Sequence, residues 1–117
     1  GVQTCALPIS WAGGDKLDEI RTLGGGGSGH AGETETSMVL AMRPDLVRTD
    51  RLDPDGEREG MRVPGVAAYH RFDQRTQHGG VGDPRPSTAE QGQALLDASA
   101  DEVAEAVRQI RELKPFS

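Results

Sequence analysis

The sequence predicts an α/β fold of which this chain forms only a part. Three segments show helical spacing or helix caps, and one short segment is compatible with a β-strand. The 117 residues suffice for one small domain, yet only 34% of them are apolar and 3% aromatic. A domain of this length buries roughly two-thirds of its unfolded surface, and few large side chains are available for that. The Leu, Val and Ile residues still fall in patterned segments, which argues against full disorder.

The first predicted helix covers residues 15–23. Leu17 and Ile20 lie three positions apart, and Asp15 stands near the helix start. Residues 24–29 follow as a run of Gly and Ser, in which no side chain can enforce one conformation. Such a run could be a flexible linker. We interpret it instead as a loop at a functional site, where close backbone approach and unusual dihedral angles require glycine.

A second helix is predicted over residues 33–42. Acidic residues and threonines favour its N-terminus. Arg43-Pro44 ends it, because the residue before a proline is disfavoured in the α conformation. The apolar residues that this helix has to bury are Met38, Leu40, Ala41 and Met42.

The middle of the chain shows little regular patterning. Residues 47–63 are polar and rich in charge, with a clear turn at residues 53–56. Residues 66–72 could form a short strand, and residues 74–86 are predicted to be a loop. Within that loop, the His-Gly-Gly-Val-Gly stretch at residues 78–82 lacks the Gly-Lys-Ser/Thr of a phosphate-binding loop. We therefore interpret it as a surface turn.

The last predicted helix has the clearest signal and extends to Leu113. Ser87 and Glu90 have the spacing of a capping box, in which two side chains satisfy backbone N–H groups at a helix start. Acidic residues crowd its first two-thirds and basic residues its end, as the helix dipole favours. Its apolar stripe must pack against a sheet or another helix. The stripe consists of Leu96, Ala100, Val103, Val107 and Ile110.

Composition excludes several classes of partner. The net charge of −6 argues against a nucleic-acid or anionic-membrane surface, which needs clustered Lys and Arg. No run approaches the roughly 18 apolar residues of a membrane span, and no signal peptide is recognisable. The single Cys5 gives neither a disulfide framework nor a zinc spacing. We expect a cytoplasmic protein that binds neither nucleic acid nor membranes.

The first residues are expected to be foreign to the protein. Residues 1–9 resemble the translation of a widely used sequencing adapter, with Ser10 at the junction. The alternative is a strand that ends at Pro8. We set residues 1–10 apart as a non-native artefact and expect residues 11–117 to be the C-terminal fragment of a single domain. The start of the chain without Met also suggests a reading frame truncated at its 5′ end.

The segment from His30 to Val47 points to a chemistry. It has the sequence HAGETETSMVLAMRPDLV, which resembles the signature of the creatininase (creatinine amidohydrolase) family. That family consists of metal-dependent hydrolases of non-peptide amide C–N bonds. The resemblance resumes at residues 82–84 and 87–92, and covers residues 26–113, weakly between 49 and 80. It implies the C-terminal part of a creatininase-like α/β/α sandwich with a mostly parallel sheet, incomplete here.

Amide hydrolysis at neutral pH requires an activated water, a stabilised oxyanion and a protonated leaving nitrogen. Divalent metal ions meet the first two needs. A histidine meets the third, because its ordinary pKa lies near neutrality. The resemblance makes His30 the family's general acid/base beside a metal pair, with the loop at Gly29 allowing it to reach the substrate. The alternative for His30 is an exposed loop histidine.

Two carboxylates follow this histidine. Glu33 is a candidate metal ligand or orienter of His30, and Glu35 matches the family's Glu-Thr-Ser and is expected to line the site. Since they are two positions apart on a helix, only one of them can face the site. The alternative for both is a capping role at the helix N-terminus.

The family's metal-binding motifs are Glu-x-His with an Asp, and an Asn-Gly-His loop, and they do not occur in this sequence. We therefore expect the divalent ions (Zn or Mn, or else Fe) to be bound mostly by an N-terminal part, and this chain alone to be inactive. The full-length enzyme is expected to be a homo-oligomer that acts on a small-molecule amide, cyclic amides included. Alternatives within the family are a peptidase acting on a peptide-derived cofactor precursor and a formamide hydrolase. An alternative from another class is a non-catalytic oligomerisation module built on the terminal helix.

Overall fold

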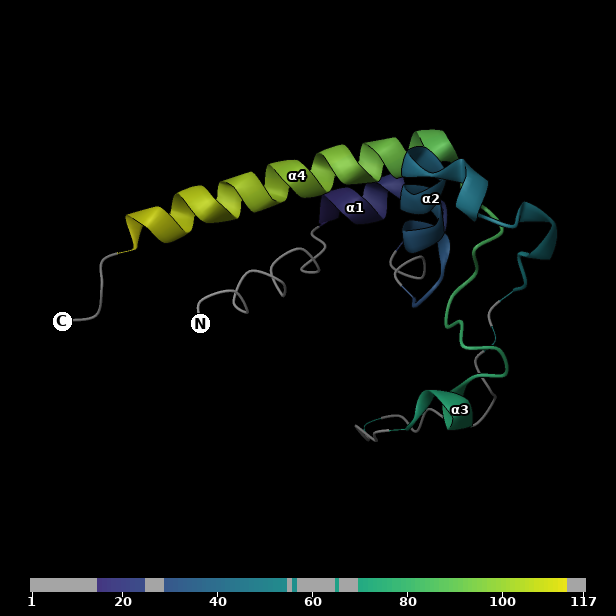
Figure 1. Cartoon of the computed structure of the whole chain (residues 1–117). Helices are drawn as coiled ribbons and strands as arrows, with labels where there is room; N and C mark the ends of the chain where they lie inside the picture. The colour runs from purple at the N-terminus through teal and green to yellow at the C-terminus, as the bar shows by residue number, and fades with distance from the viewer. Residues whose placement is uncertain (1–14, 25–28, 55, 57–64, 66–69, 114–117) are drawn as a thin grey trace, which may run out of the picture.

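The computed structural model of the 117-residue chain describes residues 15–24, 29–54, 56, 65 and 70–113. The regular structure in these ranges is helical, and no strand occurs there (Figure 1). None of the helices in these ranges is both long and apolar enough to cross a membrane. The elements are α1 (Asp15–Ile20), α2 (Glu33–Met42), the 3-10 helices η3 (Pro44–Leu46) and η4 (Thr49–Arg51), α3 (Phe72–Arg75) and α4 (Ala89–Glu112).

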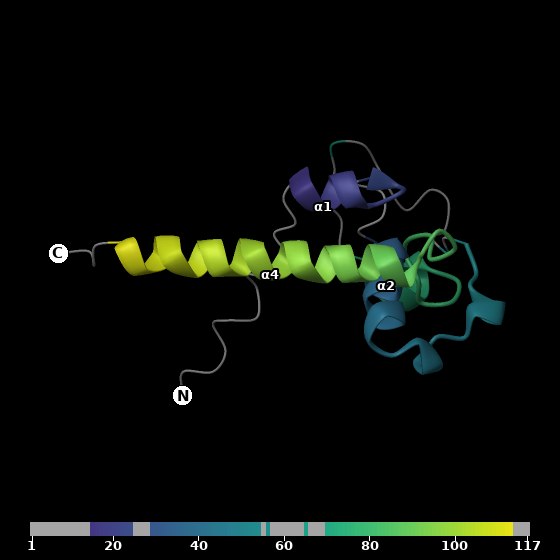
Figure 2. The ribbon, with the colours of Figure 1, turned by 90° about the horizontal axis from the view of Figure 1, so that it is seen from above.

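The long helix α4 is the element on which the other helices assemble. α1 and α2 pack along its N-terminal half (Figures 1 and 2). The short helix α3 lies far from α4, at the opposite end of the molecule (Figure 1). Leu95 of α4 is fully buried, and Leu17 of α1 is nearly so. The hydrophobic core that the described residues form is small, as the low apolar content predicts.

The C-terminal half of α4 leaves its apolar stripe uncovered. Val107, Ile110 and Leu113 are exposed, although they continue the stripe that Leu96 begins. Within the predicted stripe, Leu96 and Val103 are half-buried and Ala100 is exposed. The buried residues of α4 are Gly92 and Leu95, which the predicted stripe did not include.

A glycine allows α2 and α4 to cross at close range. A Cβ atom added to Gly92 would lie 1.8 Å from the carbonyl oxygen of Ser37. Any side chain at position 92 would therefore collide with the backbone of α2. The contact between α2 and α4 is the most extensive helix–helix contact among the described residues.

The prediction of α2 is confirmed at both ends, at Glu33 and at Met42. The helix predicted from residue 15 is shorter than expected, since α1 ends at Ile20. The reason is a distant carboxylate. Glu33 accepts hydrogen bonds from the backbone N–H groups of Thr22 and Leu23, which holds the chain after α1 in a turn.

The N-terminus of α4 is capped one residue later than predicted. The cap is Thr88, whose side-chain oxygen accepts the N–H of Gln91 at 3.1 Å. The predicted capping box of Ser87 and Glu90 is therefore wrong. The hydroxyl of Ser87 instead donates to the carbonyl oxygen of Glu33 at 3.2 Å, so a tertiary contact replaces the local one.

The predicted strand at residues 66–72 is wrong where it can be compared with the structure. Residues 66–69 lie outside the described ranges, and Phe72 begins α3. Local polar contacts favour the helical turn, since Arg71 pairs with Asp73 and its N–H donates to the side chain of Gln74. The mostly parallel sheet expected from the resemblance has no counterpart among the described residues. Residues 1–10, set apart as non-native, also lie outside them.

Candidate active site

His30 lies in a tight turn that leads directly into α2. The N–H of Gly32 donates to the carbonyl oxygen of Gly29 at 3.0 Å, and the N–H of Val81 donates to that of His30 at 2.8 Å. The next residue, Ala31, has a φ of +56°, in the left-handed region that a residue with a Cβ rarely adopts. Backbone strain of this kind persists only where the surrounding structure enforces it, so the position of His30 is fixed by its turn.

The turn of His30 packs against a second glycine-rich segment, residues 78–82. A Cβ on Gly29 would lie 1.6 Å from the carbonyl oxygen of Val81, so the two backbones touch. Gly82 has a φ of +143°, and a Cβ there would lie 3.0 Å from the Cα of Gly32. Gly80, Val81 and Gly82 are buried. The prediction of a surface turn at residues 78–82 is therefore wrong for these three residues.

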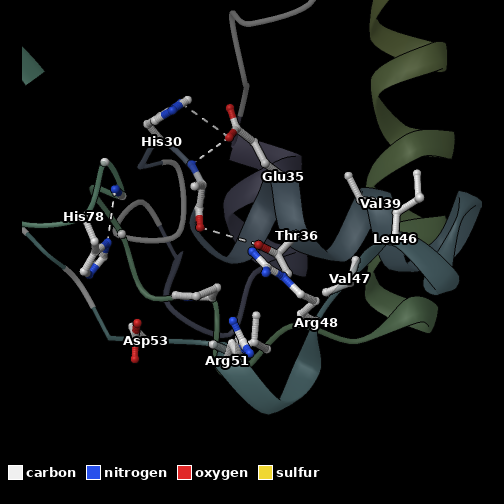
Figure 3. A pocket seen from close by; sticks show the side chains of 16 residues that line it. His30, Glu35, Thr36, Val39, Leu46, Val47, Arg48, Arg51, Asp53 and His78 are labelled. Atoms are coloured by element: carbon white, nitrogen blue, oxygen red, sulfur yellow. Dashed lines mark hydrogen bonds and ion pairs between the residues drawn. The ribbon is translucent and has the colours of Figure 1, made fainter.

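The imidazole of His30 approaches a carboxylate and an aromatic ring. Its Nδ1 is 3.7 Å from Oε2 of Glu35 (Figure 3). Its ring meets that of Phe72 edge to face, with centroids 5.1 Å apart and planes at 75°. The histidine side chain is 59% exposed. The carboxylate faces Nδ1 at ion-pair distance rather than at hydrogen-bond distance.

Glu35 connects the backbone of the turn to the imidazole. Its Oε2 accepts the N–H of Ala31 at 2.7 Å while it faces Nδ1 of His30. The side chain reaches back over the start of α2, as a glutamate in the first helical turn can do. The N-cap residue of α2 is Gly32, which has no side chain that could accept a hydrogen bond from the N–H groups of the first helical turn.

Glu33 faces the interior between the helices. It is fully buried, and its carboxylate accepts hydrogen bonds from Thr22 N at 2.5 Å, Leu23 N at 2.9 Å and Gln91 Nε2 at 2.6 Å. Burial by itself raises the pKa of Glu33, but the hydrogen bonds from Leu23, Thr22 and Gln91 outweigh it and hold the pKa below its usual value. Glu33 does not line the pocket that contains His30.

A pocket of about 620 Å³ extends from His30 and Glu35 across to η4. Figure 3 shows His30 and Glu35 at one side of it and Arg48 and Arg51 at the other. No sequence motif identifies these arginines, because only the tertiary fold brings η4 to the pocket. Their spacing of three residues before a turn is the one local signal that was present.

His78, which also lines the pocket, has a structural function. Its Nδ1 accepts the N–H of Gly80 at 3.3 Å, so the other nitrogen must carry the hydrogen. That nitrogen, Nε2, lies 3.1 Å from the carbonyl oxygen of Pro54 and donates to it. His78 therefore links the turn after η4 to the glycines that support His30.

The described residues do not by themselves fit a metal pair. No group of three or more His, Cys, Asp or Glu side chains with metal-binding geometry occurs in the described ranges. His30 and Glu35 provide two donors, fewer than a catalytic zinc site requires. A metal at Glu33 would have to displace the hydrogen bonds that its oxygens accept.

Comparisons with known proteins agree on one family. The family model described as creatinine amidohydrolase matches residues 4–107, so the match begins within residues 1–10. The crystal structure of a protein from Bacteroides fragilis NCTC 9343, provisionally named a creatinine amidohydrolase, superposes with a TM-score of 0.62 at 26% sequence identity. That superposition covers 86% of this chain and 43% of the other.

Curated relatives with similar sequences carry another name. The mycofactocin precursor peptide peptidase of Mycobacterium ulcerans (strain Agy99) is 35% identical over 83 residues. Its namesake in Mycobacterium tuberculosis (strain ATCC 25618 / H37Rv) is 36% identical over 88 residues. Each match covers 66% of this chain and 31% of the relative. The chain thus spans about a third of the length of these relatives.

Proposed function

The chain belongs to the creatininase (creatinine amidohydrolase) family, and from this premise we propose that it carries the acid–base side of an amide C–N hydrolase. One observation carries the proposal. His30 lies on a backbone turn fixed from both sides, borders a pocket and has the carboxylate of Glu35 at its Nδ1. A positioned imidazole with a carboxylate on its far nitrogen is a common arrangement for proton transfer.

In the proposed reaction, His30 holds and transfers the proton. Nε2 takes a proton from the attacking water and returns it to the leaving nitrogen. Glu35 keeps the ring oriented through Nδ1, and its negative charge stabilises the imidazolium that forms between the two transfers. The edge-to-face contact with Phe72 also restricts the orientation of the imidazole.

We propose that divalent ions (Zn or Mn, or else Fe) are held mostly by residues other than the described ones. When bound, such ions would polarise the amide carbonyl and lower the pKa of a water. Glu33 is better suited to a structural role than to metal binding, because three donors already occupy its oxygens. By itself, the 117-residue chain is then expected to be inactive.

The surrounding fold is proposed to be a creatininase-like α/β/α sandwich with a mostly parallel sheet, of which this chain forms the C-terminal part. The support is the structural similarity to the Bacteroides protein, of which this chain covers 43%. The exposed stripe of Val107, Ile110 and Leu113 provides a face for such a partner layer or for another protomer of a homo-oligomer.

A second candidate is a peptidase that acts on a peptide-derived cofactor precursor. The names of the mycobacterial relatives favour it, at 35% and 36% identity. The same acid–base pair serves either substrate, since both reactions cleave an amide C–N bond. Substrate assays distinguish the candidates.

The test is hydrolysis by the longest gene product that contains this sequence. We expect Mn²⁺- or Zn²⁺-dependent cleavage of one member of a panel of creatinine, small formamides and short peptides, with His30→Gln losing at least about a hundredfold in kcat. His70→Gln is the matched control, because His70 lies outside the pocket. Full turnover by His30→Gln would refute the proposal.

A further inference from the structure

Two arginines that line the pocket favour a substrate with a negatively charged group. Arg48 precedes η4 and Arg51 ends it, and both line the pocket that His30 borders (Figure 3). Residues three apart on a 3-10 helix lie on the same face, and the N–H of Arg51 donates to the carbonyl oxygen of Arg48 at 2.9 Å. η4 therefore presents two guanidinium groups to one side of the pocket.

These two arginines differ from most others of the described residues in lacking a strong local partner. Arg48 has no carboxylate partner among the described residues, and Arg51 approaches Asp50 only through Nε, at 3.9 Å. Their terminal N–H groups remain available. Elsewhere on the surface, four arginines each pair closely with a neighbouring carboxylate: Arg43 with Asp45, Arg71 with Asp73, Arg85 with Asp83 and Arg108 with Glu105.

We propose that Arg48 and Arg51 form a subsite for a carboxylate group of the amide substrate. The inference rests on the proposed function, in which His30 acts on the amide at the other side of the same pocket. A planar guanidinium matches a carboxylate with two parallel hydrogen bonds. A pocket of about 620 Å³ has room for an acylated amino acid or the end of a short peptide.

The subsite implies a substrate class. A neutral formamide or an uncharged cyclic amide would leave both guanidinium groups unused, whereas an N-acylated amino acid or a peptide end would bind at both sides of the pocket. Asp53 and Glu35 also line the pocket, and their negative charges disfavour an anion placed away from the arginines.

The test compares two ligands that differ only in charge. N-acetylglycine and N-acetylglycinamide share the amide, and only the first has a carboxylate. Each is titrated into the 117-residue chain and followed by the NMR signals of backbone and arginine side-chain N–H groups. We expect N-acetylglycine to bind about tenfold more tightly, with a preference that falls as NaCl rises from about 50 to about 500 mM.

Single variants identify the residues responsible. Arg48→Gln and Arg51→Gln should each remove most of the preference, while Arg43→Gln, which alters an arginine outside the pocket, should keep it. Retained backbone spectra show that the variants fold. Equal binding of the two ligands, an equal loss in Arg43→Gln, or tighter binding of inorganic phosphate than of N-acetylglycine would each overturn the proposal.

The result is separable from that for the proposed function. A carboxylate preference in a chain whose longest gene product never hydrolyses amides would support the subsite and refute the function. Hydrolysis that depends on His30 without any carboxylate preference would support the proposed function and refute the subsite.

Discussion

The side-chain amide of Gln91 donates to the carboxylate of Glu33 at 2.6 Å, linking α4 to the first residue of α2. The same Nε2 lies 3.1 Å from the carbonyl oxygen of Ile20 at the end of α1, and Oε1 accepts the hydroxyl of Ser37 at 2.8 Å. Gln91 and Glu33 thus join three helices through polar contacts. Because α2 starts at Glu33, this network also fixes the helix end on which the turn of His30 sits.

Removing the charge of Glu33 is expected to destabilise the fold. In Glu33→Gln, the new NH₂ group meets donors that the carboxylate had accepted, so buried N–H groups lose their partners. The free energy of unfolding should fall by about 2–3 kcal/mol, measured by urea unfolding followed by circular dichroism. Glu19→Gln, on the exposed side of α1, makes the same change of charge and should shift stability by less than about 0.5 kcal/mol. Equal effects of the two variants would contradict a structural role for Glu33.

The lowered pKa of Glu33 predicts a pH dependence with a definite sign. The unfolded carboxyl has the ordinary value of 4.5 and takes up a proton at a higher pH than the folded one. The stabilisation is therefore fully present above this value and is lost as pH falls below it toward the lower folded pKa. Unfolding of the wild type and of Glu33→Gln at a series of pH values should show a stability difference that shrinks below pH 4.5. A difference independent of pH would exclude a lowered pKa.

The helix crossing at Gly92 reverses the usual effect of a glycine substitution. In an exposed helix interior, Gly→Ala stabilises by up to about 1 kcal/mol. Here the added Cβ would lie 1.8 Å from the carbonyl oxygen of Ser37, so α2 and α4 must separate. Gly92→Ala should destabilise by at least about 2 kcal/mol in thermal or urea unfolding. Gln93→Ala, at an exposed neighbouring position, is the control for helix propensity. A stabilised Gly92→Ala would show that α2 and α4 do not pack closely at this position.

Those parts of the fold whose signals are local could be predicted from the sequence. α2 begins with acidic residues and ends before Pro44, and both bounds were correct. The end of α1 and the cap of α4 depend instead on contacts of Glu33 with residues 10 to 54 positions away. Helical spacing predicted that only one of Glu33 and Glu35 faces the site. Which one it is depends on where α1 and α4 supply hydrogen-bond donors, and the sequence pattern does not contain that information.

Glu35 is expected to act on catalysis through His30 rather than on folding. In Glu35→Gln, the amide can still accept the N–H of Ala31 through its oxygen, so the turn keeps its backbone contact. The imidazolium loses its stabilising charge, because a neutral amide replaces the carboxylate 3.7 Å from Nδ1. For the longest gene product, kcat should fall by about tenfold or more with KM little changed, while the urea midpoint of the 117-residue chain stays near that of the wild type. Glu33→Gln should lower the midpoint instead, so the two variants separate positioning of the imidazole from structural support. An unchanged kcat in Glu35→Gln would leave His30 without an orienting partner and refute this role.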